Sequence, residues 1–217
     1  IDRDKIVNEV LGGVNKRADG IVPPGVFGHR EDANVLPFNI DKAKAMLAEA
    51  GFPGGKGFPT VEMSFRDGRP DVELVAQSVQ QQWGQNLGVK ITLKKMEWGQ
   101  YLDLHTRKQM PLFHMRWAAD YLDAENFLST LLASYGPENK IEYVNAKYDA
   151  LCAEADSILD PEKRLKLYAE AEDIVLDDAP FVPIYFQRDA ELISPRVKGM
   201  KESLFGHLPH RTVELGK

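Results

Sequence analysis

The hydrophobic and polar positions of residues 61–118 follow two periods in turn, one typical of strands and one typical of helices. Val61, Met63 and Phe65 alternate with polar residues, as the residues of a half-buried strand do. The hydrophobic residues after them are spaced as on one face of a helix. Strands separated by helices of this length favour parallel pairing, so the pattern predicts an α/β fold. The predicted elements are strands over 61–65, 89–94 and 112–118 and helices over 72–87 and 98–107.

Two apolar stripes predict a pair of helices in the second half of the chain. Asp160 and Pro161 separate them, and this dipeptide is typical of an N-cap followed by the first residue of a helix. The first stripe carries Tyr148, Leu151, Cys152, Ala155, Ile158 and Leu159, and the second carries Leu165, Tyr168, Ala171 and Val175.

Further elements are predicted at both ends of the chain and next to the first helix pair. Pro183 interrupts an apolar strand over 181–186, which places that strand at a sheet edge or a bulge. Asn39 or Asp41 is expected to cap a helix, and Gly51 is expected to end it. The other predicted elements are helices over 1–11, 41–50 and 124–132, an irregular loop over 19–38 and a short strand over 191–194.

Composition excludes several classes of protein. The 217 residues are 43% hydrophobic, as in ordinary globular domains. A formal net charge of −6 and scattered basic residues argue against a nucleic-acid partner. No apolar run approaches the roughly 18 residues of a membrane span. Because the chain starts at Ile1 without an initiator Met, we expect a fragment of a longer protein, with any targeting segment upstream.

The sequence offers no catalytic or metal-binding motif. It lacks a nucleophile elbow, a phosphate-binding glycine loop and Cys/His spacing for a metal. His207 and His210 are three residues apart but lie in a weakly patterned tail. Residues 120–126 resemble a calcium loop but lack the central glycine and distal glutamate of an EF-hand. Cys152 lies on a predicted apolar helix face, where a small buried side chain is expected rather than a reactive thiol. We therefore expect no enzyme activity, metal or cofactor.

One segment, Trp117–Asp123, lies between the end of a predicted strand and the start of a helix. In open α/β sheets, ligands bind at this carboxyl edge. Asp123 directly precedes the helical pattern and is the better candidate for an N-cap. Asp120 is then left without a local structural role, which makes it a candidate ligand-binding residue. Trp117 shares strand parity with Phe113, so alternation alone favours a core position for its side chain.

The segment Trp117–Leu128 resembles the signature region of the family 5 extracellular solute-binding proteins, the dipeptide- and oligopeptide-binding group of ABC importers. Seven further segments resemble family phrases in the same order, so the resemblance covers almost the whole chain. They are Ile1–Ile6, Val22–Gly25, Asp41–Pro53, Trp98–Leu102, Tyr148–Leu151, Arg164–Ala171 and Ala179–Tyr185.

The resemblance implies the fold and biology of that family. The expected fold is a periplasmic-binding-protein-like (type II) α/β lobe with a mixed, mostly parallel sheet flanked by helices. Residues 1–207 would form the C-terminal ligand-binding lobe, and residues 208–217 would return to an N-terminal lobe outside this sequence. The implied protein is a monomeric, non-enzymatic receptor, free or lipid-anchored in the periplasm or at the outer face of the cell membrane. It encloses a peptide between its lobes and delivers it to an ABC permease.

The resemblance also implies roles for named residues. The aspartate of the Trp-x-x-Asp pattern, here Asp120, binds the ligand's α-amino group, and Trp117 belongs to the same pattern. Ala118 is the implied main-chain partner of the bound peptide. Trp98 matches a pocket-lining aromatic, although a partly buried residue at a helix start fits the sequence equally well. Arg107 lies where some relatives carry an arginine near the ligand's carboxylate, but its spacing to Trp117 is shorter here.

Three alternatives stay open at this point. The receptor could take a non-peptide ligand such as an oligosaccharide, a nickel chelate, haem or an opine-like molecule. An enzyme would need a nucleophile and a base within hydrogen-bonding reach, and the sequence shows no such pair. A chaperone or interaction module would expose a large apolar patch outside the cleft.

Overall fold

The computed structural model describes residues 1–190, 192–201 and 210–216. It divides into two compact units, Ile1–Phe186 and Gln187–Lys217. In the smaller unit, β6 (Val197–Lys198) pairs antiparallel with β7 (Glu214–Leu215), and η4 (His210–Thr212) precedes β7. Glu191, His207 and residues 208, 209 and 217 of the expected tail lie outside the described residues.

The larger unit contains a three-stranded parallel sheet in the order β3-β2-β4. Strand β2 (Val61–Arg66) lies in the centre, between β3 (Ile91–Met96) and the two-residue β4 (Leu112–Phe113). Helices α3 (Pro70–Leu87) and α4 (Trp98–Thr106) connect consecutive strands. The expected α/β fold with parallel pairing is therefore confirmed.

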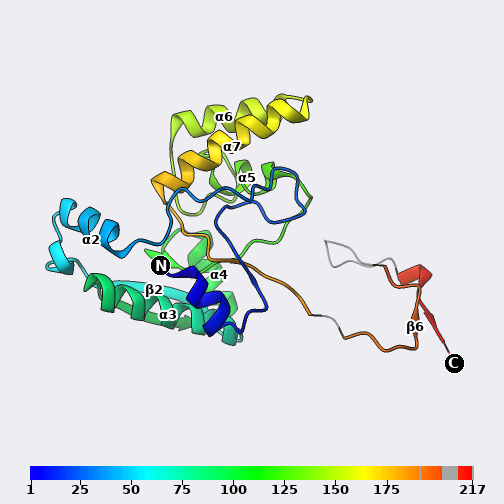
Figure 1. The fold of residues 1–217 in the computed structure, drawn as a ribbon, viewed down its shortest axis with the longest axis horizontal. Coiled ribbons are helices and arrows are strands. Elements are labelled where there is room, and N and C mark those ends of the chain that lie inside the picture. Colours follow the sequence, from blue (N-terminus) through cyan, green and yellow to red (C-terminus); the bar gives the residue numbers. More distant parts are fainter. Residues whose placement is uncertain (191, 202–209, 217) are drawn as a thin grey trace. The chain divides into compact units, whose positions relative to one another are not determined.

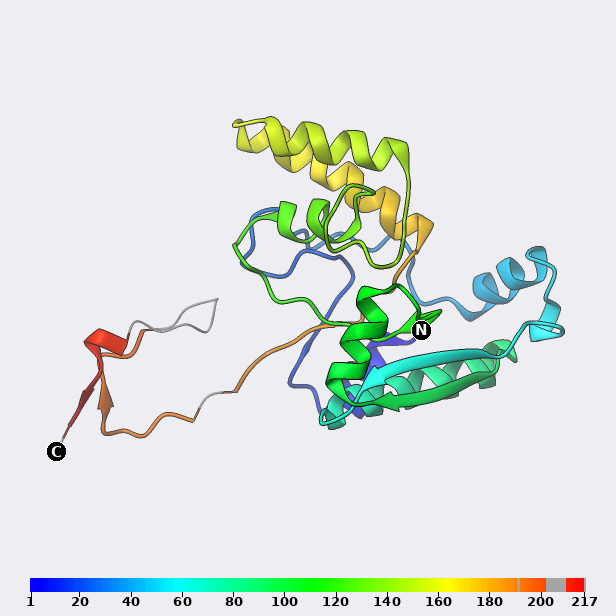
Figure 2. The same ribbon diagram turned by 180° about the vertical axis from the view of Figure 1, so that it is seen from behind.

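The two connecting helices cover opposite faces of the sheet (Figure 1, Figure 2). Met63 and Phe65 of β2 pack with Val75 and its neighbours on α3, as the alternating pattern predicts. On the other face, the buried Tyr101 of α4 packs with Met96. The N-terminal segment, α1 (Arg3–Lys5) and the π-helical turn η1 (Ile6–Val10), buries Ile6 on the α3 side.

A second core forms among the helices that follow the sheet. Helices α6 (Ala146–Ser157) and α7 (Pro161–Asp178) lie side by side, with the short α5 (Ser129–Leu132) beneath them (Figure 1). Asn145 and Asp160 each accept hydrogen bonds from the first-turn amides of the following helix. The predicted N-cap and Pro161 at the start of α7 are thus confirmed.

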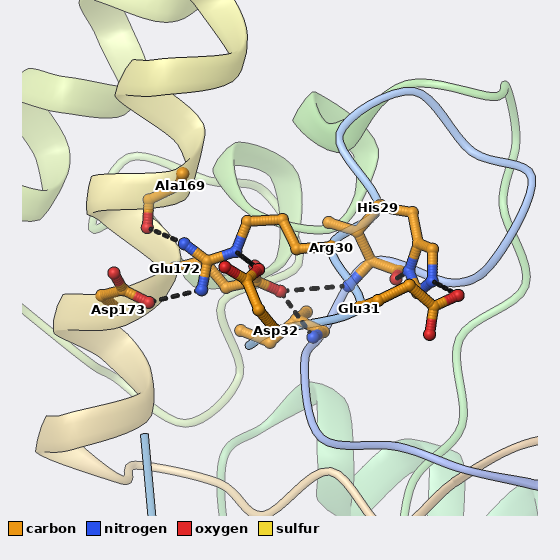
Figure 3. Close-up of polar contacts among 9 residues, drawn as sticks. His29, Arg30, Glu31, Asp32, Ala169, Glu172 and Asp173 are labelled. Carbon is orange, nitrogen blue, oxygen red and sulfur yellow. Dashed lines mark hydrogen bonds and ion pairs between the residues drawn. The ribbon is translucent and has the colours of Figure 1, made fainter. Parts of the chain in front are cut away.

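The irregular loop over 19–38 is tied to α7 by a buried carboxylate. Glu172 is 1% exposed and accepts hydrogen bonds from the Ile21 and Val22 amides, at 2.7 and 3.4 Å. The Arg30 Nε lies 3.1 Å from the other Glu172 oxygen, and Arg30 also pairs with Asp173 at 2.5 Å (Figure 3). A loop without regular structure is therefore fixed by side-chain contacts.

The elements between the two cores are short. Helix α2 (Ile40–Glu49) is capped by Asn39, and Gly51 follows it with a positive φ, as expected. The remaining turns are η2 (Pro53–Gly55) and η3 (Ala124–Asn126). Strand β1 (Lys16–Arg17) pairs antiparallel with β5 (Tyr185–Phe186).

Several predicted boundaries were wrong. The strand over 112–118 stops at Phe113, because only Leu112 and Phe113 find partners on β2. The strand over 181–186 shrinks to β5, which begins after Pro183. Residues 192–194, the described part of the strand over 191–194, are not in a strand.

Three predicted helices also differ. The helix over 1–11 contains only a short α-helical turn before η1, and the helix over 124–132 divides into η3 and α5. Helix α6 ends at Ser157, so Leu159 falls outside the apolar stripe and is 98% exposed. Leu165, placed on the inner face of α7 by its spacing, is exposed as well.

Candidate ligand-binding site

The carboxyl ends of the three parallel strands meet at one edge of the sheet, where open α/β folds bind ligands. Arg66 ends β2 there, and Met96 ends β3 two residues before Trp98. After β4, the His114 amide still donates to the Ser64 carbonyl at 2.9 Å. The chain then leaves the sheet toward residues 117–123.

Trp98 is the first residue of α4 and lies at this edge. The Glu97 side chain caps the helix by accepting hydrogen bonds from the Gly99 and Gln100 amides. The Trp98 indole is 37% exposed and stacks on Tyr101, with ring centroids 5.9 Å apart. The Arg66 guanidinium carbon lies 4.3 Å from the Trp98 ring centroid. The edge therefore presents an exposed aromatic ring next to a cation.

Tyr101 joins this aromatic group to the chain after β4. Its side chain is fully buried, and its hydroxyl donates to the His114 carbonyl at 2.5 Å. The same hydroxyl lies 3.9 Å from the Met115 sulfur. Burial lowers the pKa of His114 to about 4, so this imidazole is neutral near pH 7. Met115 is 38% exposed and adds apolar surface to the edge.

The loop from Trp117 to Asp123 holds one of its two aspartates in place and leaves the other exposed. Asp123 caps η3 by accepting from the Glu125 amide, as predicted. Arg164 of α7 also donates to both Asp123 oxygens, each at 2.9 Å. Asp120 is exposed, and within the described ranges no hydrogen bond or ion pair engages its carboxylate.

A model of the "Bacterial extracellular solute-binding proteins, family 5 Middle" matches residues 1–139. The chain belongs to this family. The expectation drawn from Trp117–Leu128 and the other segments is thereby confirmed, and the family is one of solute-binding proteins rather than catalysts.

Relatives within family 5 carry names for different ligands. The chain is 32% identical to "Heme-binding protein A" of Haemophilus influenzae over 95% of its own length and 38% of that protein. It is 31% identical to the "Periplasmic oligopeptide-binding protein OppA" of Escherichia coli, over 92% of the chain and 37% of the relative. The chain therefore spans less than two-fifths of the length of these relatives.

A solved family structure has the same fold. The structure of the murein tripeptide binding protein MppA of Escherichia coli matches all of this chain and 43% of its own, with a TM-score of 0.86 and 27% identity. The expected type II periplasmic-binding-protein-like fold is confirmed by this match.

The family 5 chain brings only some of the predicted site residues together. Trp117, Ala118 and Asp120 share one loop, with Ala118 exposed and Trp117 packed partly buried against the helical core. Trp98 lies at the sheet edge and stacks on Tyr101, whose hydroxyl bonds to His114, three residues before that loop. Arg107 is the residue after α4, at the opposite end of this helix from Trp98, and pairs with Asp103 at 2.9 Å.

Two residues of this edge were missed as contributors to the site. Arg66 could have been found from its position, since it is the last residue of the central strand at the carboxyl edge. Within the described ranges, its Nε is buried without a hydrogen-bond partner. Asn126 is almost fully buried beneath the loop. The spacing of hydrophobic residues does not predict that a polar side chain is buried there.

A hollow of about 270 Å³ lies elsewhere, among α2, the end of α3 and residues 176–183. Its lining is mainly apolar and includes Phe38, Met46 and Trp83, but none of the predicted site residues. Within the described ranges, no three His, Cys, Asp or Glu side chains are placed to hold a metal ion. None of the helices in those ranges has the length and apolarity needed to cross a membrane.

Proposed function

We propose that this chain is the ligand-binding C-terminal lobe of a receptor that captures peptides for an ABC importer, and that Asp120 receives the peptide's α-ammonium group. The observation that carries the proposal is the contrast between two carboxylates in one loop. Arg164 and a backbone amide occupy the Asp123 carboxylate. The Asp120 carboxylate is exposed and unpaired within the described part of the chain.

A carboxylate of this kind fits the amino terminus of a peptide. An ammonium group enclosed between two lobes loses its water and needs an opposite charge as a partner. A charge-assisted hydrogen bond contributes about 1.5–3 kcal/mol, enough to set the direction and register of the bound peptide. In the open receptor Asp120 remains hydrated, and the partner arrives with the ligand.

The other contacts follow from the surroundings of Asp120. The exposed Ala118 offers main-chain groups that can pair with a peptide backbone as an added strand does. Trp98 and Trp117 supply apolar walls. Arg66, stacked on Trp98, supplies a positive charge for an anionic group of the ligand. Because main-chain hydrogen bonds do not depend on the side chains of the peptide, the receptor would accept many peptide sequences.

The proposal includes the rest of the receptor. Residues 1–207 form the lobe, and residues 208–217 return to an N-terminal lobe of the same protein. The peptide bridges the two lobes and stabilises the closed form by its higher affinity for it. The receptor is a monomer that works in the periplasm or at the outer face of the membrane and passes its ligand to a permease. The name of the oligopeptide-binding relative supports a peptide ligand and a periplasmic location.

A non-peptide ligand is the second candidate, because one of the most similar relatives is named for haem. Haem has carboxylates but no ammonium group, so Asp120 would not assist its binding. Arg66, rather than Asp120, would then be the charged residue that matters. The same variants therefore separate the two candidates.

The test uses the full-length protein and isothermal titration with a tripeptide and its N-acetylated form. We expect Asp120→Asn to lower the affinity for the free tripeptide by about 10- to 100-fold, which corresponds to the loss of one charge-assisted hydrogen bond. The affinity for the acetylated form should fall far less. Asp177→Asn, which changes an exposed aspartate on α7, is the matched control and should change neither affinity. Equal losses for the two peptides would rule out the ammonium contact.

A further inference from the structure

We propose that Asn126 is the positioning residue of the ligand-binding loop, because its amide oxygen fixes the main chain of Asp120 and the indole of Trp117 together. This inference rests on the proposed function and adds a residue to it. Asn126 itself does not contact the bound peptide. It acts through the two residues that it holds.

The geometry places one buried acceptor under two donors. The Asn126 side chain is 1% exposed. Its Oδ1 accepts a hydrogen bond from Trp117 Nε1 at 2.9 Å and one from the Asp120 amide at 3.0 Å. A carbonyl oxygen has two lone pairs, so both bonds can form at once. The loop from Trp117 to Asp120 is thus attached at both ends to a single atom.

No other hydrogen bond in the described ranges fixes residues 117–120. Strand pairing on this side ends at Phe113, and the last sheet bond is from the His114 amide. Within those ranges, the bonds to Asn126 are the only hydrogen bonds of residues 117–120. The direction in which the Asp120 side chain projects from the main chain therefore depends on Asn126.

The base of this arrangement is rigid. Asn126 ends η3, whose N-cap Asp123 is bound twice by Arg164. The adjacent Phe127 and Leu128 are buried in the helical core. Asn126 consequently fixes residues 117–120, which form no regular structure, relative to the helical core.

The chemistry of the side chain suits this role. A neutral amide oxygen can be buried while accepting two bonds, without the cost of burying a charge. An alanine here would leave the Trp117 indole N–H and the Asp120 N–H without partners. An aspartate would keep an oxygen at the same place and could still accept both bonds.

The experiment compares Asn126→Ala and Asn126→Asp with Asn139→Ala in the full-length protein. Asn139 is also buried and donates to the carbonyls of Leu132, Ala133 and Tyr143, none of which is a proposed site residue. Its replacement therefore controls for the loss of a buried asparagine as such. Each variant is titrated with the free and N-acetylated tripeptides, and its melting temperature is recorded.

We expect Asn126→Ala to lower the affinity for the free tripeptide by about tenfold, the size of one lost hydrogen bond. The preference for the free over the acetylated tripeptide should fall as well. Asn139→Ala should lower the melting temperature similarly while keeping both affinities. Asn126→Asp should restore the preference for the free peptide. The Trp117 indole N–H resonance of the ligand-free protein should move in Asn126→Ala and stay unchanged in Asn139→Ala, which tests the geometry independently of ligand.

The outcomes separate this inference from the proposed function. If Asp120→Asn has no effect on the free tripeptide, the proposed function fails and the inference fails with it. Asp120→Asn could lower the affinity for the free tripeptide while Asn126→Ala keeps the same preference for the free over the acetylated peptide as Asn139→Ala. In that case only the positioning role is overturned. An unmoved indole resonance in Asn126→Ala would overturn the positioning role as well.

Discussion

Arg164 of α7 holds Asp123 of the ligand-binding loop by two parallel hydrogen bonds, each 2.9 Å long, across 41 residues of sequence. The two side chains are 19% and 26% exposed, so the pair is largely screened from water. The Arg164 guanidinium carbon also lies 5.2 Å from the ring centroids of Phe27 and Tyr168. This pair connects the helical core to the loop that carries Asp120.

The first prediction concerns this ion pair. Arg164→Ala should lower the free energy of unfolding by about 1.5–3 kcal/mol, because a mostly buried carboxylate loses a bidentate charged partner. Urea denaturation measures the change. Arg107→Ala removes an exposed arginine, whose pair with Asp103 is 63% and 52% exposed, and should cost less than about 0.5 kcal/mol. Equal costs for the two variants would show that the Asp123 pair is not structural.

The second prediction uses two glycines in opposite surroundings. A Cβ added at Gly20 would lie 2.8 Å from the Ala33 Cβ and 2.8 Å from a Glu172 oxygen. Gly20→Ala should therefore destabilise the fold by about 1–3 kcal/mol through overpacking. At Gly84 in α3 the nearest atom would be 3.9 Å away, so Gly84→Ala should add about 0.5–1 kcal/mol of stability. Thermal unfolding of both variants checks the opposite signs.

The third prediction concerns the single cysteine. Cys152 is fully buried in the helical core, and burial raises the pKa of its thiol to about 12. It should not react with a disulfide reagent in the native protein and should react once on denaturation. Leu159→Cys places a thiol at a 98% exposed position and should react at once under native conditions. Rapid native labelling of the unmodified protein would contradict the buried position.

Local sequence signals were enough to predict the helix caps and the sheet. They were not enough to predict contacts between segments that lie far apart in the sequence. Asp123 was correctly expected to cap a helix, because a cap depends only on the residues that follow it. Its pairing with Arg164 depends on how two helices pack, which the spacing of apolar residues does not encode. The same limit hid Asn126, since a polar residue beside an apolar run is read as facing solvent.

Strand length shows the limit most clearly. Alternation continues through Phe113, Met115 and Trp117, and it predicted a strand to residue 118. The strand ends at Phe113 because β4 is an edge strand with β2 as its neighbour, and pairing with β2 stops there. Past that point the His114 amide still bonds to the Ser64 carbonyl, and the chain then leaves β2. The proposed function assigns the loop that follows, residues 117–120, to the peptide. Alternation describes the faces of a segment, whereas pairing depends on a neighbour.

The last prediction concerns the pH dependence of stability. Burial raises the pKa of Glu172, although the Ile21 amide, the Arg30 guanidinium and the Val22 amide act in the opposite direction. Between the unfolded value of 4.5 and the higher folded value, the folded chain keeps a proton that the unfolded chain has released. The contribution of Glu172 to stability is therefore largest below the unfolded pKa and is lost as pH rises through the folded pKa.

Glu172→Gln removes this titration and keeps a side chain of the same shape. We expect the stability of the native protein relative to Glu172→Gln to fall as pH rises from 4.5 through this window, as measured by urea denaturation at closely spaced pH values. Asp173, Asp32 and Arg30 lie around the same carboxylate and are present in both proteins, so their titration largely cancels in the difference. Glu170→Gln, at an exposed glutamate of α7 paired with Lys147, should give no such trend. A difference that grows with pH would mean that the Arg30 ion pair outweighs burial and that the pKa of Glu172 is lowered.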